Sequence, residues 1–286
     1  MANLKEIRNR ITSIGSTMQI TSAMKMVSAA KLKKAQDAIT AMRPYSSKLT
    51  ELLQNLSATL DGNAGGDYST QREVSKVLFV VVTSNRGLCG GFNSSITKEV
   101  VKTVAEKYAD KTVELFTIGK KGNTLGKSFK VIDSRDDIFD NLNFESVAEI
   151  ASQLMELYID GSYDKIELVY NRFKNAATQI PQVEQFLPIK PVDEGTVVTN
   201  SDYIFEPSKE EIVLALIPKS LKTQLYKSIR DSFAAEHGAR MTAMHKATDN
   251  AKDLRDDLLL TYNKARQAAI TNEILEIVGG AEALNN

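Results

Sequence analysis

The chain has 286 residues, 42% of them apolar, and its 36 basic side chains balance its 36 acidic ones, which gives a formal net charge of zero. This balance gives no indication of a nucleic-acid partner. The single cysteine, Cys89, excludes an internal disulfide framework and fits a reducing compartment. No apolar run reaches the roughly 18 residues that a membrane-spanning helix needs, and the first residues have no signal-peptide pattern. We therefore expect the chain to associate with a membrane only through another protein.

Charge is distributed unevenly along this neutral chain. Residues 1–60 carry nine basic and three acidic side chains, a net charge of +6, whereas residues 61–208 carry 16 and 22, a net charge of −6. Residues 209–286 balance at 11 of each sign. The amino-terminal segment is therefore positive, and we expect it to meet an acidic partner surface.

Residues 4–60 predict one very long helix, because helical periodicity continues and no proline precedes Pro44. Pro44 is expected to kink this helix, and the glycine-rich residues 61–67 predict a loop after it. Apolar side chains recur at the spacing of a coiled-coil seam, with a shift at Ile20: Leu4, Ile7, Ile11, Ile14, Met18, then Met24, Val27, Ala38, Met42, Tyr45, Leu49, Leu52, Leu56 and Leu60.

The middle of the chain alternates predicted strands and helices. The apolar, β-branched run VLFVVVT at residues 77–83 is typical of a strand buried on both faces, and Asn93 is predicted to cap the helix that follows. Such alternation favours a mostly parallel, doubly wound sheet with right-handed crossovers. The predicted elements are strands at 77–83, 113–118 and 165–170, helices at 94–108 and 144–159, and an extended segment at 182–189.

A second very long helix is predicted from residue 209 to residue 278, with an irregularity at Pro218 and a stop at Gly279 and Gly280. At 1.5 Å rise per residue, the two terminal helices would span roughly 85 and 105 Å, which is too long for a compact core to cover. Small and flexible side chains occupy much of the second stripe, so close but weak packing in a slender antiparallel coiled coil is expected. This stripe comprises Leu221, Leu225, Ile229, Phe233, Met241, Met244, Ala251, Leu254, Leu258, Tyr262, Ala265 and Ala269.

The fold class that follows is α/β, with a Rossmann-like, mostly parallel sheet domain inserted between two long terminal helices that form an antiparallel coiled coil. The expected segments are an amino-terminal coiled-coil helix at 1–60, a loop at 61–75, the α/β domain at 76–208 and a carboxy-terminal coiled-coil helix at 209–286. The end of the second helix, around Ile270 to Val278, is apolar on several sides and is expected to enter an apolar sleeve formed by partners.

Two loops invite a ligand-binding interpretation. GNTLGKS at residues 122–128 resembles a phosphate-binding P-loop, but its glycines enclose three residues where that motif needs four, so a polar loop is the preferred interpretation. SNRGLCGGF at residues 84–92 lies between a strand and a helix, where α/β domains bind ligands, but lacks GxGxxG spacing. Cys89 would need a histidine to act as a nucleophile, and the only candidates, His237 and His245, lie on the last helix.

Three separated motifs in the same order resemble the γ subunits of F-type ATP synthases. These are ITSAMKMVSAAKLKKA at residues 20–35, SNRGLCGGFN at 84–93, and the run at 239–280 that contains ARMTAMHKATDNA and YNKARQAAITNEILEIVGGA. The resemblance covers nearly the whole chain. It implies that the terminal helices form a coiled coil inside a hexamer of alternating α and β subunits. The α/β domain would form a foot that sits with the ε subunit on the c-ring.

In function, the resemblance implies a rotor shaft that couples proton or sodium flow to ATP synthesis on the β subunits and carries out no chemistry itself. One copy is expected per complex, with three α and three β subunits, and without cofactor, metal or nucleic acid. The chain lacks the inserted cysteine pair of the chloroplast type, and no presequence precedes the family's start. A bacterial protein, peripheral on the cytoplasmic face of the inner membrane, is therefore expected, although a processed organellar chain would look similar.

The resemblance also assigns roles to particular residues. Arg266 and Gln267 are expected to hydrogen-bond a β-subunit loop, and Met24 corresponds to a coupling-sensitive position. Lys31, Lys33 and Lys34 would form an electrostatic contact at the rim, although an ordinary solvated face is the alternative. Two further contacts are expected. The loop residues Arg86, Gly87 and Cys89 would contact the hexamer, and Tyr203 and Glu206 would contact the c-ring.

Two other classes of protein remain open at this point. An α/β enzyme whose terminal helices only dimerise would need a cluster of catalytic groups, and the sequence contains no triad, metal-ligand spacing or complete phosphate loop. A coiled-coil scaffold that binds nucleic acid through its basic first helix would be expected to interleave aromatic residues with the basic ones, and the chain contains no tryptophan.

Overall fold

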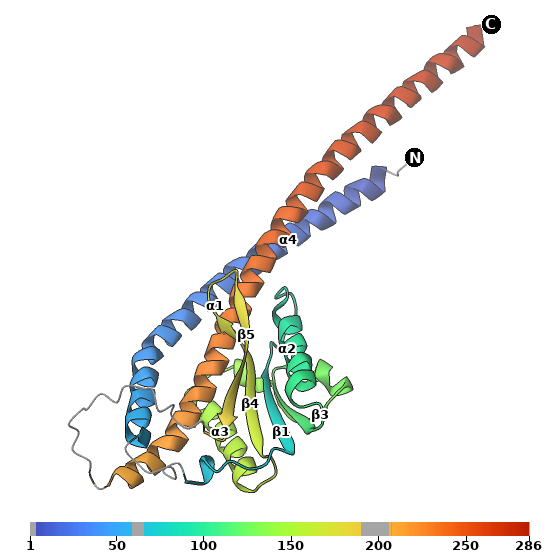
Figure 1. The fold of residues 1–286 in the computed structure, drawn as a ribbon. Coiled ribbons are helices and arrows are strands. Elements are labelled where there is room, and N and C mark those ends of the chain that lie inside the picture. The colour runs from blue at the N-terminus through green and yellow to red at the C-terminus, as the bar shows by residue number, and fades with distance from the viewer. Residues whose placement is uncertain (1–3, 59–65, 190–205, 207, 286) are drawn as a thin grey trace. The chain divides into compact units, whose positions relative to one another are not determined.

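The structure is a computed structural model that describes residues 4–58, 66–189, 206 and 208–285. In chain order, one long helix precedes all the other elements and another follows them. Figure 1 labels most of the elements. In order, the elements are α1 (Leu4–Ala58), η1 (Gly66–Tyr68), β1 (Lys76–Val82), α2 (Phe92–Lys107), β2 (Thr112–Ile118), η2 (Lys120–Lys127), β3 (Lys130–Arg135), η3 (Asp137–Phe139), α3 (Phe144–Ile159), β4 (Lys165–Phe173), β5 (Gln179–Leu187) and α4 (Lys209–Asn285).

The chain divides into two compact units. The first, here called the helical unit, combines Met1–Ser28 with Met241–Asn286, so the outer parts of α1 and α4 pair with each other. The second, here called the sheet unit, comprises Ala29–Arg240 and contains all five strands together with the inner parts of α1 and α4.

The sheet unit is built on one five-stranded sheet with the order β3-β2-β1-β4-β5. β1 pairs in parallel with β2 and β4, and β2 pairs in parallel with β3, whereas β4 and β5 form an antiparallel hairpin. This arrangement confirms the predicted Rossmann-like, mostly parallel sheet between two long terminal helices.

Helices cover both faces of this sheet, and β1 lies at its centre. Every residue from Val77 to Val82 is fully buried, which confirms the prediction from its continuous apolar run. One core, around Leu78, contains side chains of α3 and of the first part of α4. The opposite core, around Phe79, contains side chains of α2 together with Ala235 and Ala239 of α4. The inner part of α4 therefore contributes to both cores.

One outer strand of the sheet was not predicted, and the other is antiparallel to its neighbour. β3 was missed because its sequence, KVIDSR, alternates without a continuous apolar run and is only partly buried at the sheet edge. β5 is antiparallel because a short turn joins it to β4, in which the side-chain oxygen of Asn175 accepts hydrogen bonds from the backbone N–H groups of Ala177 and Thr178. Such a turn leaves no room for the helical crossover that a parallel strand needs.

The prediction that Asn93 caps α2 was wrong. The helix begins at Phe92 with Gly91 at its N-cap, and the Asn93 side chain instead accepts a hydrogen bond from the backbone N–H of Ser84. By contrast, α3 has a side-chain cap, because Asn143 accepts a hydrogen bond from the backbone N–H of Ser146.

Neither proline ends a terminal helix, and α4 also continues past Gly279 and Gly280 to Asn285. A helical proline leaves the carbonyl four residues earlier without its N–H partner. Before Pro44 and Pro218 these residues are Thr40 and Leu214, which are both exposed, so water can satisfy the carbonyl. Glycine costs only about 1 kcal/mol relative to alanine in a helix, and the glycine pair therefore does not break α4.

Candidate coupling surfaces on the terminal helices

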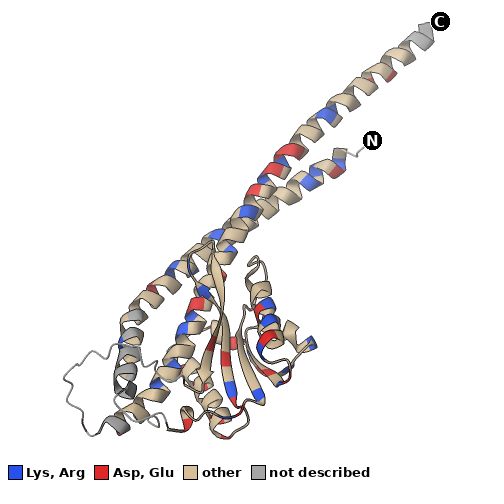
Figure 2. Cartoon of the chain, viewed as in Figure 1, with Lys and Arg blue, Asp and Glu red and all other residues tan. Residues whose placement is uncertain are grey.

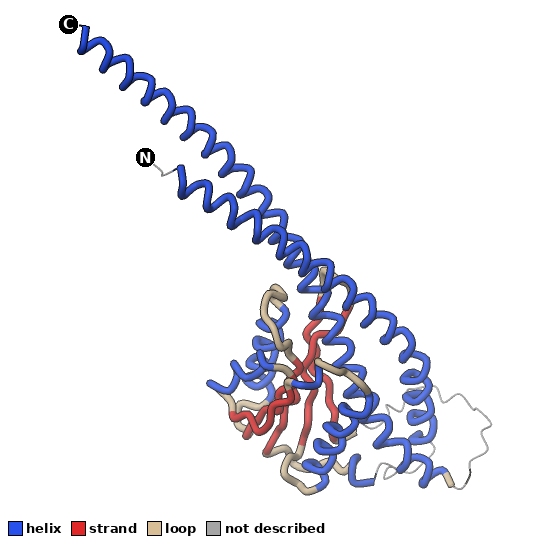
Figure 3. Tube along the Cα trace, turned by 180° about the vertical axis from the view of Figure 1, so that it is seen from behind, coloured by secondary structure: helices blue, strands red, loops and turns tan. Residues whose placement is uncertain are grey.

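The outer parts of α1 and α4 pair in antiparallel orientation within the helical unit. Thr21 and Thr248 share a hydrogen bond of 2.8 Å between their hydroxyl oxygens. Further along the pair, the guanidinium of Arg8 donates a 2.6 Å hydrogen bond to the hydroxyl of Tyr262 and lies 5.6 Å from its ring centroid. The earlier residue of α1, Arg8, is level with the later residue of α4, Tyr262, so the two helices form an antiparallel coiled coil (Figure 3).

The seam of α1 keeps one register instead of shifting at Ile20. Buried and partly buried positions recur with alternating spacings of four and three residues: Ile7, Ile11, Ile14, Met18, Thr21, Lys25, Ser28, Leu32, Ala35, Ile39, Met42, Ser46 and Leu49. Val27 and Tyr45, predicted seam residues, are 57% and 58% exposed. The hydroxyls of Thr21 and Ser28 donate to the carbonyls of Met18 and Met24, so both polar side chains can be buried in the seam.

On α4, the seam of the helical unit shows the same alternation. Its buried and partly buried positions are Met244, Thr248, Ala251, Arg255, Leu258, Tyr262, Ala265 and Ala269. Leu254, predicted for this seam, is 51% exposed, and Arg255 takes its position. Small side chains fill much of the interface, as expected for a slender pair.

The paired segments also complement each other in charge (Figure 2). Residues 4–28 carry four basic and one acidic side chain, a net charge of +3, and residues 241–285 carry five basic and seven acidic ones, a net charge of −2. The four exposed aspartates at positions 249, 253, 256 and 257 belong to this acidic part of α4. The two paired segments therefore carry net charges of opposite sign.

The predicted coupling residues of the helical unit lie at two separate levels. Met24 is partly buried in α1, beside Met26 and Val27, which are 65% and 57% exposed. Arg266 and Gln267 are exposed on α4, beyond the level of Tyr262 and its partner Arg8. Since Thr248 is level with Thr21, about 20 residues of helix, or roughly 30 Å, separate the two levels along the pair.

The end of α4 exposes an apolar surface. Ile270, Ile274, Leu275, Ile277 and Val278 are between 48% and 66% exposed. A surface of this kind on a helix end usually marks a site of protein association.

The three lysines predicted for the rim contact, Lys31, Lys33 and Lys34 of α1, lie in the sheet unit and are all exposed. Lys33 forms a 2.8 Å ion pair with Asp37 one turn later. Lys31 lies close enough to Glu236 and His237 of α4 to influence their ionisation. One lysine of the predicted rim contact therefore faces a buried charged cluster of α4.

Within this cluster, Arg240 of α4 holds the predicted contact loop at residues 84–93. Its guanidinium donates to the carbonyls of Arg86 and Gly87 at 3.1 and 3.3 Å, and to the carboxylate of Glu236 at 2.5 Å. Glu236 and Arg240 are only 7% exposed. Burial raises the pKa of Glu236, and the nearby positive charges of Arg240 and Lys31 oppose this shift.

The contact loop presents Arg86 and Leu88 outward and turns Cys89 inward. Leu88 is 64% exposed and adopts a positive φ of 61°, whereas Cys89 is only 2% exposed. The Cys89 sulfur accepts a 3.2 Å hydrogen bond from the Asn93 amide. A partner would therefore touch Arg86 and Leu88 before Cys89, and Leu88 is a contact candidate that the sequence analysis did not single out.

The geometry gives no support to catalysis at Cys89. Burial raises the pKa of its thiol and so disfavours the nucleophilic thiolate. His237 packs edge-to-face on Phe233 at 4.5 Å between ring centroids, and its Nδ1 lies 3.5 Å from Arg240. Burial and the adjacent positive charge lower the pKa of His237 to about 3, so it is neutral near pH 7.

The P-loop-like residues 122–128 fall largely in η2 and pack against β2. A side chain at Gly122 would meet the Cβ of Thr117 at 2.9 Å, and the Thr117 hydroxyl donates to Asn123 at 3.0 Å. Gly122 therefore allows η2 to approach the sheet closely, and its face is filled by protein. Within the described parts of the chain, no group of three or more His, Cys, Asp or Glu side chains could hold a metal ion.

Of the two predicted c-ring contacts, Glu206 is described and exposed, whereas Tyr203 lies outside the described residues. Over the described ranges, none of the helices combines the length and apolar character required to cross a membrane.

Comparisons with known proteins identify the family. A family model described as ATP synthase matches residues 3–284. The chain is 73% identical to the ATP synthase gamma chain of Flavobacterium psychrophilum over 285 residues, covering 99% of both. It is 64% identical to that of Christiangramia forsetii over 286 residues, covering all of both. The chain belongs to the ATP synthase gamma chain family.

Solved structures agree with this assignment. A chain from the central stalk and c-ring of the Tetrahymena thermophila mitochondrial ATP synthase is 28% identical and covers 80% of this chain and 99% of its own length, with a TM-score of 0.61. A chain from the Euglena gracilis mitochondrial ATP synthase rotor is 20% identical and covers 93% of this chain and 98% of its own length, with a TM-score of 0.69. At this identity, the likeness shows the fold alone. As a gamma chain, the protein is the central-stalk rotor subunit of an F-type ATP synthase.

Sequence reasoning missed the Glu236–Arg240 pair that holds the contact loop. A signal was present, because Glu236 and Arg240 are spaced i, i+4 on one helix face among alanines and a glycine. Charged residues spaced in this way are most often solvated, and only the packing of α4 on the sheet shows that these two are buried.

Proposed function

We propose that this gamma chain turns as a shaft within a head of three α and three β subunits and carries out no chemistry itself. Ion flow through a membrane-embedded c-ring would drive its rotation, and the rotation would couple to ATP synthesis or hydrolysis on the β subunits. One copy would serve each complex, with the ε subunit and the c-ring at its foot, on the cytoplasmic face of a bacterial inner membrane. The foot would correspond to residues 76–208, with Tyr203 and Glu206 facing the c-ring.

The observation that carries this proposal is the exposed apolar end of α4. Residues such as Leu275 and Ile277 are 63% and 66% exposed and lie further along α4 than Tyr262, which is already level with Arg8 near the start of α1. They therefore need a partner surface to become buried. A sleeve of apolar side chains from the head would bury them without fixing one angle of the helix, because apolar contacts are not directional.

Directional contacts would come from the polar residues beside this apolar end. Arg266 and Gln267 are exposed and can hydrogen-bond a β-subunit loop, and a hydrogen bond from arginine to a carboxylate contributes about 1.5–3 kcal/mol. Such a contribution is large enough to favour one rotor angle. Met24, Arg86 and Leu88 would add contacts at other levels, with Gly87 and Cys89 shaping the loop.

The exposed lysines would act differently, by long-range attraction. Lys31, Lys33 and Lys34 would face acidic β-subunit loops, where each exposed pair contributes about 0–1 kcal/mol and is screened by salt. Contacts this weak can bias the angle of the shaft without arresting it.

The proposal is tested by reconstitution. The purified chain is mixed with α and β subunits, the stoichiometry is read by native mass spectrometry, and ATP hydrolysis is measured together with ATP-driven ion transport after membrane-sector binding. We expect one copy per α3β3 hexamer and restored hydrolysis. Arg266→Ala with Gln267→Ala should lower hydrolysis, and Met24→Lys should lower transport more than hydrolysis because it adds a charge near the β-subunit loop.

Asn263→Ala with Lys264→Ala serves as the matched control, because both residues are exposed on α4 one turn earlier. This control should assemble and couple like the unchanged chain. Failure to form any hexamer complex, or equal losses in the control and the Arg266 and Gln267 variant, would overturn the assigned coupling surface.

A further inference from the structure

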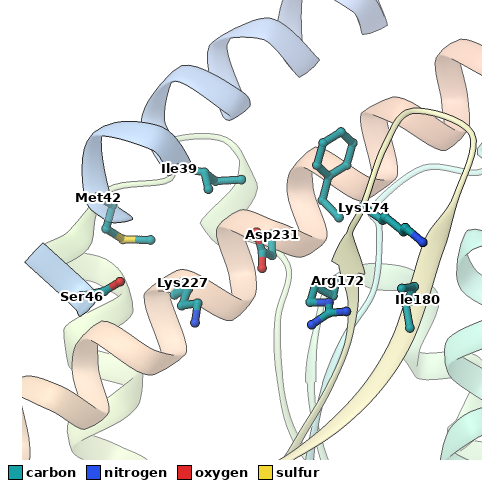
Figure 4. Close-up of a pocket in the computed structure, with 9 residues that line it drawn as sticks. Ile39, Met42, Ser46, Arg172, Lys174, Ile180, Lys227 and Asp231 are labelled. Atoms are coloured by element: carbon teal, nitrogen blue, oxygen red, sulfur yellow. The ribbon is translucent and has the colours of Figure 1, made fainter. Parts of the chain in front are cut away.

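The sheet unit contains a cavity that the rotor function does not use. Its volume is about 530 Å³, and α1, the β4–β5 hairpin and α4 all contribute to it (Figure 4). Arg172 pairs directly with Ile180 across the hairpin, so their side chains share one face of the sheet. The lining residues are Ile39, Met42, Ser46, Arg172, Phe173, Lys174, Ile180, Lys227 and Asp231.

Positive charge gathers at this cavity without being neutralised. The lining contains three cations, Arg172, Lys174 and Lys227, and one carboxylate, that of Asp231. Among the residues that the structure describes, none of the three cations makes a hydrogen bond or an ion pair. The cavity thus concentrates unpaired donors for an anion.

Apolar side chains form the rest of the lining. Ile39 is buried, and Met42, Phe173 and Ile180 are partly buried around the same space. A volume of about 530 Å³ lies within the range of sites that hold small organic molecules. The cavity therefore suits a ligand with a charged group and an apolar group, and is larger than a bare anion requires.

We propose that this cavity binds a small, soluble phosphate ester. The phosphate would lie against Arg172 and Lys227, because a guanidinium presents two parallel donors to phosphate oxygens and an ammonium adds a compact charge. The organic group would lie against Ile39, Met42 and Ile180. A bound ligand would link α1, the hairpin and α4 within the sheet unit. This proposal is independent of the rotor function.

Binding is measured on the full chain by NMR with labelled isoleucine and methionine methyl groups. The probes are phenyl phosphate, which has both groups, inorganic phosphate, which has only the charge, and phenol, which has only the apolar part. We expect phenyl phosphate to shift the methyl signals of Ile39, Met42 and Ile180 in a saturable way and to bind at least about tenfold more tightly than either other probe. Ile96, buried in the core on the α2 face, should not shift.

Paired substitutions locate the site. Arg172→Gln with Lys227→Gln removes two exposed cations of the cavity and should weaken phenyl phosphate binding at least about tenfold while the fold is retained. Lys98→Gln with Lys102→Gln removes two exposed cations of α2, outside the cavity, and should leave the affinity unchanged. Met42→Gln should weaken phenyl phosphate binding more than inorganic phosphate binding.

Three results would overturn the proposal. The first is shifts that do not saturate or that spread to Ile96, and the second is equal affinity in both double variants. The third is binding only to vesicles of phosphatidylglycerol in phosphatidylcholine, lost in the Arg172 and Lys227 variant, which would assign the cavity to a lipid headgroup. Because none of these measurements uses the assembled ATP synthase, they are independent of the reconstitution experiment.

Discussion

Arg240 shows how a single buried side chain can hold a surface loop. It binds two loop carbonyls and one carboxylate at once, from a position only 7% exposed. The three acceptors use the planar arrangement of guanidinium donors, which lysine lacks. Arg240 therefore ties Arg86 and Gly87 of the contact loop to α4.

Replacing Arg240 by methionine should destabilise the chain by about 3–5 kcal/mol, because Glu236 would remain buried without its partner. The free energy of unfolding in denaturant measures this loss. The loosened loop should also make the Cys89 thiol react faster with a thiol reagent. Glu236→Gln added to Arg240→Met should recover part of the stability, and equal losses in the single and double variants would contradict this account.

His237 predicts a pH dependence of stability. Its pKa of about 3 in the folded chain lies below the ordinary value of 6.5, so between these values only the unfolded chain takes up the proton. Stability should therefore rise with pH across this window, by at most about 1.4 kcal/mol per pH unit from this residue. Arg240, Lys31 and Phe233 face the ring, and they keep it neutral.

The measurement is the free energy of unfolding at a series of pH values between 4 and 7. His237→Gln should flatten the rise, whereas His245→Gln, at the other histidine and on an exposed surface, should preserve it. An unchanged slope in His237→Gln would show that other groups cause the rise.

At the scale of elements, Gly15 in α1 and Gly238 in α4 allow a matched comparison. Replacing either by alanine improves helix propensity, but only at Gly238 would the added methyl group meet close neighbours. An alanine methyl at Gly15 would meet nothing within 4 Å, whereas at Gly238 it would meet the backbone of Ala176 at 3.1 Å and the ring of Phe173 at 3.3 Å. Gly15→Ala should therefore stabilise α1 by about 0.8–1 kcal/mol. Gly238→Ala should lose that gain, because the β4–β5 turn must move away.

Thermal unfolding followed by circular dichroism compares the two variants. We expect a higher melting temperature for Gly15→Ala and an unchanged or lower one for Gly238→Ala. A rise in both would mean that the turn at Ala176 yields easily and that packing does not require the glycine.

The sequence predicted elements best where one physical signal dominated. β1 followed from a continuous apolar run, and α3 followed from an amphipathic pattern. Part of the α1 seam was placed wrongly after Ile20, because counting apolar residues favours Val27 over Thr21 and Ser28, whereas Met42 and Leu49 were placed correctly. The hydroxyls of Thr21 and Ser28 bond to carbonyls of the preceding turn, which is a local solution that hydrophobic periodicity cannot show.

The candidate site was predicted unevenly for a similar reason. The exposed positions of Arg266, Gln267 and the α1 lysines agree with surface roles, although nothing measured tests those roles. The hydrogen bonds from Arg240 to the carbonyls of Arg86 and Gly87 join residues more than 150 positions apart. Such contacts follow from the packing of α4 on the sheet, which the local sequence does not specify.

At the scale of the whole molecule, the two units should differ in local stability. The sheet unit buries two apolar cores, whereas the described part of the helical unit has few buried apolar residues, among them Ile7, Met244 and Ala251. Segments with few buried apolar contacts open at lower free energy than a core strand. Amides of residues 4–28 and 241–285 should therefore exchange with solvent faster than those of β1.

Hydrogen exchange read by mass spectrometry tests this difference on the isolated chain. In the assembled α3β3 complex, the same helical segments should become protected, because partners bury their exposed surface. Protection in the isolated chain equal to that of β1 would show that the slender seam is as stable as the sheet cores.

The exposed end of α4 constrains the chain before it has any partners. Side chains such as Ile274, Leu275 and Ile277 remain in water from the moment the helix forms, and only other subunits would cover them. A newly made copy would therefore tend to cluster with other copies through these ends if it accumulated. Synthesis together with the head subunits, or a chaperone that covers the helix end, would prevent this clustering. The same apolar surface that suits rotation inside the head therefore limits how long the unassembled chain remains monomeric.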